Sequence, residues 1–321
     1  MRGHPDPTMD LKVANAAELG SLLAGANARG EKVAAFDLSR MNRVLDHKAE
    51  DMTATVEAGM TLTALQDALA THGQWLPVDP PNPQGLTVGA LLATNPSGPR
   101  RFGYGVVRDY VIGLLAVLAD GRLIHSGGKV VKNVAGYDLM KLFIGSHNSL
   151  GVIVQATFKV LPRPEAERLV QSKCESFEQA DSLIESVLNS EVTPIVLDLH
   201  HLSPGDQRLS LVVGFAGTRD AVEWQISKAA ELGLKEPATL DYERAFFAET
   251  APFRKASVLP SKTIELVRSL NKAPFVARAG NGIIYHRGPA GPATSGSPES
   301  IERRLKNEFD PKNILSSLSH A

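Results

Sequence analysis

The proline-dense segment at 76–85 (LPVDPPNPQG) places the firmest constraint on what this chain can fold into. Proline restricts the backbone angle φ and lacks an amide hydrogen, so Pro77, Pro80, Pro81 and Pro83 exclude a helix and a central strand here. The sequence therefore predicts an extended, stiff loop. A loop held this rigidly can lie along a ligand, and regular elements must form before and after it.

Two helices and two strands are predicted before this loop. Leu19, Leu22 and Leu23 share an apolar helical face, and the letters TATVEA alternate as in a strand. Thr61 is a suitable N-cap for the second helix, which Gly73 terminates. The expected elements are a helix over 11–28, a strand over 32–36, a turn (DLSRMN) leading into 43–46, a strand over 53–58 and a helix over 62–72.

After the loop, small residues are followed by β-type alternation. The run 87–95 is typical of a helix start, and the letters PSGPRRFGYG break regular structure. From Tyr110 the pattern turns to strands, with Asp120 and Gly121 as a hairpin turn signal. A short helical or turn-rich element is expected over 138–144, an alternating strand over 151–160, and a boundary at 161–164.

The C-terminal half has the pattern of a small antiparallel sheet backed by helices. The segments 195–200 and 209–216 are expected to pair. The other expected elements are strands over 165–173 and 277–287, helices over 178–189, 219–233 and 302–309, and a flexible tract over 288–300.

Composition excludes several classes of protein. The length of 321 residues allows a main domain and a smaller one, and 43% apolar with 21% charged residues is ordinary for a globular protein. The net charge of −1 is unlike the basic surface of a nucleic-acid binder. Cys174 is the only cysteine, so this chain alone can form no disulfide and hold no iron–sulfur cluster. It has no accompanying base motif, which favours an ordinary small residue over a nucleophile.

Other kinds of site and segment also lack support. The histidines show no H-x-x-x-H spacing, and the adjacent His200 and His201 would point to opposite faces of a strand, so no metal site is expected. There is no G-x-S-x-G elbow and no P-loop. The N-terminus has no apolar signal region and no stretch approaches the ~18 apolar residues of a membrane span. We therefore expect a cytoplasmic enzyme or enzyme subunit.

Two glycine-rich stretches carry the residue types of a phosphate- or flavin-binding site. Gly89 and its small neighbours allow a close backbone approach. Arg100, Arg101 and Arg108 would place positive charge beside a pyrophosphate or a carboxylate, although isolated arginines more often form surface ion pairs. A second close approach is predicted over 145–151, whose glycines could instead be plain turn residues.

The segment between these stretches leaves alternatives open. Lys132 and Asn133 either line the pocket or brace the loop. For Tyr137 and Asp138, a buried hydrogen-bonded pair with a structural role is favoured over a catalytic one.

Three blocks together resemble one family. They are TVGALLATNPSGPRRFGYGVVRDYVIG at 87–113, GGKVVKNVAGYDLMKLFIGSHNSLGVI at 127–153 and LKNEFDPKNIL at 305–315. They resemble the flavin-binding domain of the vanillyl-alcohol-oxidase and p-cresol-methylhydroxylase superfamily, and within it the E-type subunit of bacterial glycolate oxidase. The clear match covers about 52–164, and weaker similarity runs to the C-terminus. Blocks of this length, in this order and spacing, argue against chance.

The resemblance implies a fold class and a domain organisation. The class is α+β, a two-subdomain FAD-binding fold of the vanillyl-alcohol-oxidase type with a smaller α+β cap domain. The implied FAD-binding domain of the p-cresol-methylhydroxylase type covers 1–163 and is shortened at its N-terminal phosphate loop. A cap or substrate domain covers 164–290, and a flexible tract with a C-terminal helix at 291–321 returns to the FAD domain.

FAD is the cofactor that the resemblance implies, while no metal and no catalytic residue are assigned. The residues it implies around FAD are Asp79, Thr87, Gly89, Thr94, Asn95, Ser97, Gly98, Arg101, Gly105, Arg108, Asp109, Gly145, Ser146, Gly151, Val152 and Ile153.

The chain departs from the family pattern at three places. Where the family usually has a G-G-G-T or G-x-G-T loop, the chain passes through EKVAAF into DLSRMN. This change removes main-chain donors to the pyrophosphate, and each unmet charged contact would weaken FAD binding by about 1–3 kcal/mol. The H-x-G-D-G-N-x-H strand of catalytic relatives corresponds to 278–285, which lacks both histidines and the aspartate, so no evident base remains. The terminal L-N-P-G-R is replaced by LSSL at 315–318, and Asn148 and Ser149 replace a usual Gly and Thr.

Two hypotheses about function follow from the resemblance. The first is an FAD-binding subunit of a 2-hydroxy-acid (glycolate-type) oxidase or dehydrogenase complex, which oxidises a small 2-hydroxy acid to a 2-oxo acid. Its partners would be a D-type flavoprotein subunit and an iron–sulfur F-type subunit, through which it could lie peripherally at the inner membrane. The second is a non-catalytic structural subunit with lost or weakened FAD binding. The missing loop and histidines favour the second hypothesis, and the intact block 87–109 favours the first.

Overall fold

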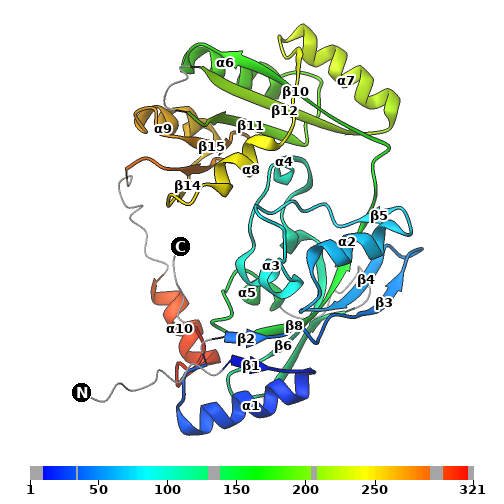
Figure 1. The fold of residues 1–321 in the computed structure, drawn as a ribbon, viewed down its shortest axis with the longest axis vertical. Coiled ribbons are helices and arrows are strands. Elements are labelled where there is room, and N and C mark those ends of the chain that lie inside the picture. Colours follow the sequence, from blue (N-terminus) through cyan, green and yellow to red (C-terminus); the bar gives the residue numbers. More distant parts are fainter. Residues whose placement is uncertain (1–9, 34, 129–137, 204–207, 290–298, 317–321) are drawn as a thin grey trace.

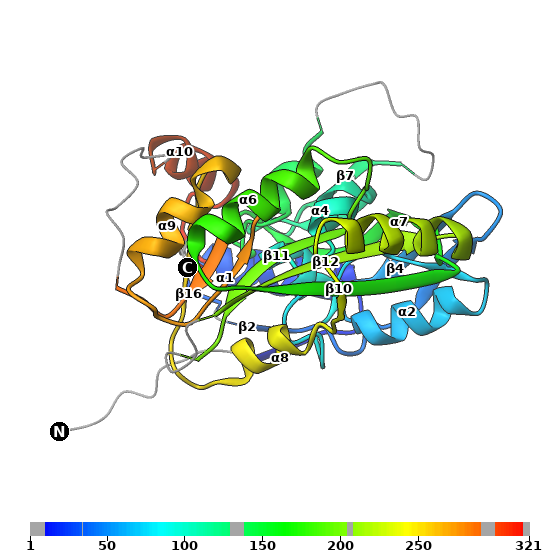
Figure 2. The same cartoon turned by 90° about the horizontal axis from the view of Figure 1, so that it is seen from above.

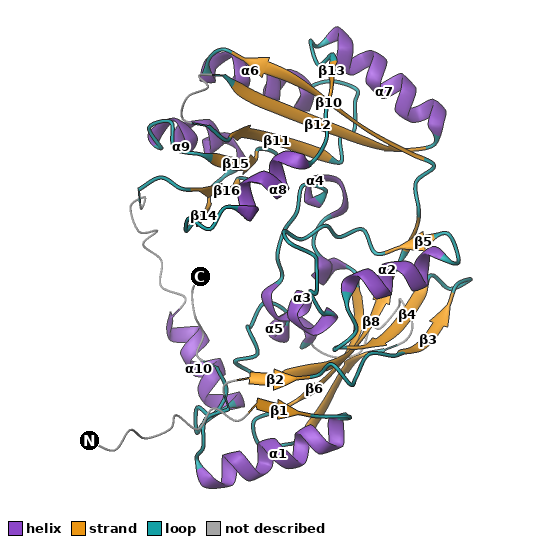
Figure 3. Cartoon of the chain, in the orientation of Figure 1, coloured by secondary structure: helices purple, strands orange, loops and turns teal. Residues whose placement is uncertain are grey.

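The computed structural model describes residues 10–33, 35–128, 138–203, 208–289 and 299–316. This part of the chain contains a five-stranded sheet, in the lower half of Figure 1, and a seven-stranded sheet, in the upper half. Both halves mix helices with strands (Figure 3), which confirms the predicted α+β class. Lys132, Asn133 and Tyr137 lie outside the described residues, as does most of the tract over 288–300.

The five-stranded sheet is antiparallel throughout. In spatial order its strands are β3 (Val44–Lys48), β4 (Thr53–Glu57), β8 (Val152–Lys159), β6 (Val111–Val117) and β7 (Leu123–Gly127). The predicted hairpin turn joins β6 to β7, and Gly121 takes its φ of 86°, which glycine adopts without strain. The predicted strands form, but burial does not alternate along β4 and β8, because both faces of these inner strands are covered.

Helices cover both faces of this sheet. On one face, Val56, Leu114 and Phe158 pack with the apolar residues of α2 (Leu62–Ala70) and α3 (Val88–Thr94). As predicted, Thr61 caps α2 and the proline-dense segment forms neither helix nor strand. Hydrogen bonds from Leu62 N to Leu86 O and from Val88 N to Met60 O, both 2.8 Å long, hold the two helix starts together.

The N-terminal segment covers the other face and differs from the prediction. It consists of β1 (Asp10–Lys12) and β2 (Ala35–Asp37), which pair in parallel, and of α1 (Ala16–Arg29) between them. The predicted helix over 11–28 is wrong at its start, because the Asn15 side chain accepts a hydrogen bond from Glu18 N at 2.9 Å and caps the helix there. Leu19 and Leu23 of α1 pack with Val117 and Val154 of the sheet.

The seven-stranded sheet is also antiparallel. In spatial order its strands are β13 (Glu236–Pro237), β10 (Ala166–Cys174), β12 (Leu209–Gly217), β11 (Val196–His201), β15 (Phe275–Arg278), β16 (Ile283–His286) and β14 (Arg254–Ser257). On its outer face lie α6 (Phe177–Leu188), α7 (Arg219–Glu231) and α9 (Thr263–Ser269), seen from above in Figure 2. On its inner face, toward the five-stranded sheet, lies α8 (Asp241–Ala248).

This sheet is larger than the sequence pattern indicates. The single strand predicted over 277–287 is wrong, because the segment folds into the hairpin of β15 and β16. Gly282 makes the turn at a φ of 70°, and a Cβ there would lie 2.0 Å from Val258 O. The predicted pair over 195–200 and 209–216 is confirmed as β11 and β12.

Short elements connect the two halves. The pair β5 (Gln74–Trp75) and β9 (Leu161–Pro162) marks the point where the chain leaves the five-stranded half. The helix α4 (Arg101–Tyr104) reaches the other sheet, where Gly103 N donates to Ile195 O at 3.1 Å. The remaining short helices are η1 (Val107–Asp109), α5 (Met140–Phe143) and η2 (Pro260–Lys262).

The C-terminal helix α10 (Glu299–Phe309) lies against the five-stranded half (Figure 1). The Phe309 ring meets the Phe143 ring edge-on at 5.7 Å, and Ile314 and Leu315 join the apolar cluster under α1. Val33 N donates to Ile314 O at 2.8 Å, so the end of the chain closes onto its beginning. In the described part of the chain, no helix combines the length and the apolar character that a membrane span requires.

We expect two glycine-to-alanine substitutions in α1 to change stability in opposite directions. A Cβ at Gly20 would lie 2.8 Å from Gly121 O, so Gly20→Ala should push α1 off the β6–β7 turn and destabilise the fold by about 1–3 kcal/mol. A Cβ at Gly25 meets only the flexible end of Arg29, so Gly25→Ala should stabilise the helix by roughly 0.5–1 kcal/mol. Urea unfolding measures both, and equal shifts of the same sign would contradict this packing.

Candidate functional site

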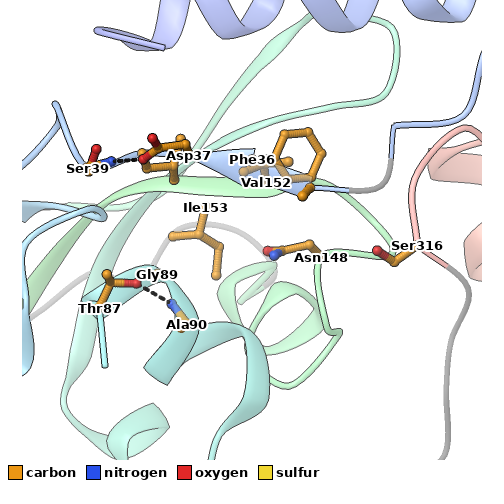
Figure 4. A pocket seen from close by; sticks show the side chains of 12 residues that line it. Phe36, Asp37, Ser39, Thr87, Gly89, Ala90, Asn148, Val152, Ile153 and Ser316 are labelled. Carbon is orange, nitrogen blue, oxygen red and sulfur yellow. Dashed lines mark hydrogen bonds between the residues drawn. The ribbon is translucent and has the colours of Figure 1, made fainter. Parts of the chain in front are cut away.

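A cavity of about 280 Å³ lies between the turn after β2, the start of α3 and the start of β8 (Figure 4). Four residues that the sequence analysis assigns to the cofactor line it: Thr87, Gly89, Val152 and Ile153. The other lining residues, which that assignment does not include, are Ala35, Phe36, Asp37, Leu38, Ser39, Ala90, Asn148 and Ser316.

The start of α3 forms one wall of the cavity. Thr87 caps the helix, because its Oγ1 accepts a hydrogen bond from Ala90 N at 3.2 Å. Gly89 N donates to Ala58 O at 2.7 Å, and a Cβ at Gly89 would lie 3.1 Å from that oxygen. The small residue predicted here thus lets the helix start pack directly against the residue that follows β4.

A β-bulge shapes the wall formed by β8. The pairing of β6 with β8 changes register between Leu115 and Ala116. At this end of β8, Val152 and Val154 pack under α1, whereas Ile153 packs with the cluster of α2 and α3. Bulges re-aim side chains at the rims of sheets. Val152 and Ile153, which lie on opposite faces at this end of β8, both line the cavity and give it apolar surface.

The turn after β2 forms the wall that the family pattern assigns to a glycine-rich loop. Hydrogen bonds from the Ser39 hydroxyl and amide to the half-buried Asp37 carboxylate lower the pKa of Asp37, and the amide bond is 2.9 Å long. A Cβ at Gly59 would lie 1.8 Å from Leu38 O, so only glycine admits this turn against the end of β4. The family loop is therefore replaced by a different turn in the cavity wall.

The loop over 145–151 contributes a fourth wall through Asn148. His147 and Asn148 have φ values of 53° and 61°, a left-handed backbone that asparagine tolerates better than most residues. This explains why Asn148 can stand where the family usually has glycine. Gly145 N donates to Leu92 O at 2.9 Å, which ties the loop to α3. Ser146 is buried and its hydroxyl donates to Phe143 O at 2.8 Å. The loop ends at Gly151, where a Cβ would lie 2.9 Å from Val117 O.

A second group of predicted residues lies at the junction between the two sheets. Asn95 ends α3 at a φ of 45°, and its Oδ1 is buried without a hydrogen-bond partner among the described residues. Ser97 is buried, accepts a hydrogen bond from Arg101 Nη1 at 2.6 Å through its hydroxyl, and is reached at its carbonyl by the Tyr285 hydroxyl at 3.4 Å. Ser97 thus contacts β16 of the seven-stranded sheet, and neither Asn95 nor Ser97 lines the cavity.

Asp79 also lies at this junction. Its carboxylate pairs with Arg100 at 3.1 Å, and Arg100 also pairs with Glu167 of β10 at 2.6 Å, so one guanidinium links the two halves. A Cβ at Gly98 would lie 1.7 Å from Asp79 O, which makes glycine necessary there. Burial raises the pKa of Asp79 to about 6 against the opposing effect of Arg100.

The remaining predicted residues lie on the surface or in turns away from the cavity. Thr94 is exposed, with its hydroxyl donating to Ala90 O at 2.7 Å. Arg108 and Asp109 are exposed, and the Asp109 carboxylate accepts a hydrogen bond from Val106 N at 2.9 Å. Gly105 supports this turn, because a Cβ there would lie 2.5 Å from Asp109 Oδ2.

A buried charge cluster adjoins the junction on the inner side of the seven-stranded sheet. Arg278, only 1% exposed, forms ion pairs with Asp198 and, at 2.6 Å, with Glu243. The Tyr242 hydroxyl donates to Asp198 at 2.7 Å. Burial opposes the charge of Arg278, but the two carboxylates outweigh it and hold its pKa well above the usual value. Burial raises the pKa of Asp198 to about 7; Arg278 opposes this shift, and the nearby Glu243 carboxylate adds to it.

Other polar candidates stay without a site. Burial raises the pKa of the Cys174 thiol, which suits the predicted inert role. His200 stacks on Tyr242 at 4.4 Å, and burial lowers its pKa to about 3. Asp138 pairs with Lys141 at 3.1 Å. Among the described residues, no group of three or more histidines, cysteines or carboxylates could hold a metal ion.

Comparison with known proteins identifies the fold. The chain superimposes on alkyldihydroxyacetonephosphate synthase with a TM-score of 0.69 at 18% identity, covering 94% of this chain and 74% of that one. Residues 12–127 match the family described as "FAD binding domain".

Curated relatives also match part of the chain. Glycolate oxidase subunit GlcD of Bacillus subtilis (strain 168) is 35% identical over 179 residues, which are 56% of this chain and 38% of that protein. Glycolate oxidase subunit GlcE of Escherichia coli (strain K12) is 40% identical over 124 residues, 38% of this chain and 35% of that protein. D-lactate dehydrogenase of Archaeoglobus fulgidus is 40% identical over 144 residues, 45% of this chain and 32% of that protein. The matches thus span only 32–38% of the length of these relatives.

The match identifies residues 12–127 as an FAD-binding domain, and the structural superposition shows the fold of the chain. The chain is related over part of its length to glycolate oxidase subunits and a D-lactate dehydrogenase, and its cofactor is FAD. The resemblance seen in the sequence is thereby confirmed.

The cavity residues fit a part of FAD. Phe36, Val152 and Ile153 offer apolar surface for a flat ring, while Asp37 and Ser39 offer an acceptor and a hydroxyl. The volume of about 280 Å³ is small beside the ~300–1,000 Å³ of typical ligand pockets, so the cavity holds one portion of a dinucleotide. None of the arginines predicted to lie beside the pyrophosphate lines it.

The raised pKa of Asp198 predicts a pH dependence of stability. An unfolded carboxyl has a pKa of about 3.9. Between that value and about 7, the unfolded state has lost the proton that the folded state keeps. The contribution of the Asp198 carboxyl to the free energy of unfolding is therefore fully present below about pH 4, and it is lost as the pH rises through about 7. Asp198→Asn removes the titrating group. Raising the pH from 5 to 8 should thus destabilise the wild type more than the variant, by about 1–3 kcal/mol.

Urea unfolding of both proteins at pH 5 and pH 8 measures this difference. The comparison cancels the contribution of His200, which is neutral in the fold and acts in the opposite direction. Asp181→Asn, at an exposed position of α6, is the matched control and should leave the pH dependence unchanged. Parallel pH profiles of the wild type and Asp198→Asn would show that Asp198 is ionised in the fold.

Proposed function

We propose that this chain is an FAD-binding subunit of a 2-hydroxy-acid (glycolate-type) oxidase or dehydrogenase complex. It takes part there in the flavin-mediated oxidation of a 2-hydroxy acid to a 2-oxo acid. Residues 1–163 act as the FAD-binding domain, 164–290 as the cap, and 291–321 as the segment that returns to the FAD domain. The relatives' names support this class, since they are glycolate oxidase subunits and D-lactate dehydrogenases.

One observation carries the proposal for the cofactor. Four residues selected from the sequence as flavin contacts line a single cavity, although they come from two separate elements, the start of α3 within the domain matched as FAD-binding and the start of β8. In our proposal, Thr87 and Gly89 at the start of α3 form a closely packed wall against the cofactor, and Asp37 accepts hydrogen bonds from ribose hydroxyls. Asn95, Ser97, Arg101 and Gly145 lie toward the junction and would contact the ring portion.

When bound, FAD supplies the acceptor for a hydride from the substrate. This chain's own residues bind and orient it, and the junction between the sheets shields it from water. We assign no base to this chain. The segment 278–285 corresponds to the catalytic histidine strand of the family pattern. Its Arg278 pairs with two carboxylates, and the pKa of Arg278 is raised, so this side chain stays protonated and cannot act as a base.

The partners in our proposal follow from what this chain lacks. A D-type flavoprotein subunit would supply the base, and an iron–sulfur F-type subunit would carry the electrons that a chain with one cysteine cannot. Assembly in the cytoplasm, with peripheral attachment to the inner membrane through these partners, is part of the same proposal.

A specific observation favours a second candidate, a non-catalytic subunit with lost or weakened FAD binding. The end of β2 places a carboxylate, Asp37, in the cavity where the family pattern predicts glycine amides, and Lys12 pairs with it at 3.5 Å. No arginine or lysine lines the described cavity itself. A pyrophosphate would meet fewer donors there.

The visible spectrum of the purified full chain separates the two candidates. We expect the absorbance bands of oxidised flavin, with stoichiometric FAD released on heating. A colourless, folded protein that takes up no added FAD would refute the first candidate and support the second.

Ala90→Leu tests the placement of the cofactor. Ala90 lines the cavity (Figure 4), so the larger side chain should occupy the volume that FAD needs and weaken FAD binding at least tenfold. The melting temperature of the FAD-free protein should stay unchanged, because the side chain enters open space. Ala64→Leu, at an exposed position of α2, is the control. Titration with FAD, followed by flavin fluorescence, measures both, and unchanged affinity in Ala90→Leu would place FAD elsewhere.

A further inference from the structure

We propose that Lys306 sets the shape of the FAD cavity by holding two of its walls at a fixed spacing. Its ammonium group joins the loop over 145–151 to the segment that follows α10. This inference rests on the proposed function, because the cavity is taken to be the FAD site. It makes Lys306 a positioning residue, since other residues line the cavity.

The contacts of Lys306 converge from both walls. Its Nζ donates to Ser149 O at 2.8 Å on one side, and to Ser316 O at 3.0 Å and Leu315 O at 3.3 Å on the other. Lys306 is 8% exposed although it carries a charge. A buried ammonium with carbonyl acceptors is costly unless every donor is used, so its presence marks a specific connection.

Asp310 completes the connection. Its carboxylate pairs with Lys306 at 2.6 Å and is 1% exposed. It also accepts hydrogen bonds from Ile314 N at 3.0 Å and from Leu315 N at 2.8 Å. The pair therefore fixes the backbone from Asp310 to Leu315, directly before Ser316 enters the cavity.

Both connected segments reach the cavity. Asn148, next to Ser149, and Ser316 line it together. The loop needs support, because His147 and Asn148 both have positive φ values, a backbone conformation that few residues other than glycine and asparagine adopt readily. Serine hydroxyls brace the loop from within, since Ser149 Oγ donates to Ser146 O at 2.6 Å. Lys306 is the contact that ties it to the C-terminal segment.

The connection differs from ordinary docking of α10. The helix is already anchored by apolar contacts such as that of Phe309 with Phe143. An apolar residue at 306 could preserve that packing, but it would leave the carbonyls of Ser149 and Ser316 unconnected. The walls would then be free to separate, and the cavity would lose the spacing that FAD needs.

The test uses the full chain and FAD as the probe. Lys306→Met combined with Asp310→Asn removes the charges as a pair and keeps one acceptor oxygen, which can still bind the Ile314 amide. We expect FAD to bind at least tenfold more weakly, and the visible circular dichroism of the remaining bound flavin to change at saturating FAD. A merely structural role would lower the melting temperature and leave both readouts unchanged.

Lys312→Met is the matched control. Its Nζ also donates to backbone carbonyls, Asn27 O at 2.7 Å and Ala28 O at 3.5 Å, but these lie at the end of α1. Its FAD affinity should equal that of the wild type. Should the double variant fail to fold, Lys306→Gln, which keeps two N–H donors on a shorter side chain, should weaken binding to an intermediate extent.

The outcomes separate the two proposals. A wild type that binds no FAD refutes the proposed function. A wild type that binds FAD, together with a folded Lys306 variant of the same affinity and flavin spectrum, overturns the role of Lys306 alone.

Discussion

Close backbone contacts around the end of β4 hold the candidate site together. The turn after β2 approaches Gly59 so closely that a Cβ there would lie 1.8 Å from Leu38 O, and α3 begins against Ala58 through the amide of Gly89. Both contacts join main chain to main chain, so no side chain can adjust to relieve a misfit. The cavity lies between these two approaches, and its shape therefore depends on positions where only very small residues fit.

The junction between the sheets depends on a different kind of interaction. Arg100 joins Asp79 to Glu167 across the two halves, and Arg278 is shared by Asp198 and Glu243. Burial raises the pKa of Asp79 and of Asp198, although the guanidinium group beside each carboxylate acts in the opposite direction. The two arginines thus hold four carboxylates at the junction and on the inner side of the seven-stranded sheet.

Sequence reasoning finds the site residues whose signal is local. Thr87 is a helix cap, Gly89 follows it closely, and Val152 and Ile153 begin a strongly alternating strand, so pattern and family resemblance coincide there. It misses Phe36, Asp37 and Ser39 because the glycine signal of the family is absent from their segment, and only their position after β2 could have indicated them. The charge of Arg108 suggests a cofactor contact, but its exposure depends on how the turn at 107–109 faces solvent, which no local pattern specifies.

Local patterns in the chain specify most of its elements and the class of protein. Hydrophobic period, caps and the proline-dense loop predict most helices and strands, and three long blocks carry the family resemblance. Long-range packing settles which residues meet. It makes a hairpin of 277–287, because Gly282 turns against Val258, and it brings Ser316 to Asn148 through the buried ammonium of Lys306. These contacts join residues far apart in the chain, so their energy depends on packing and desolvation that local sequence does not encode.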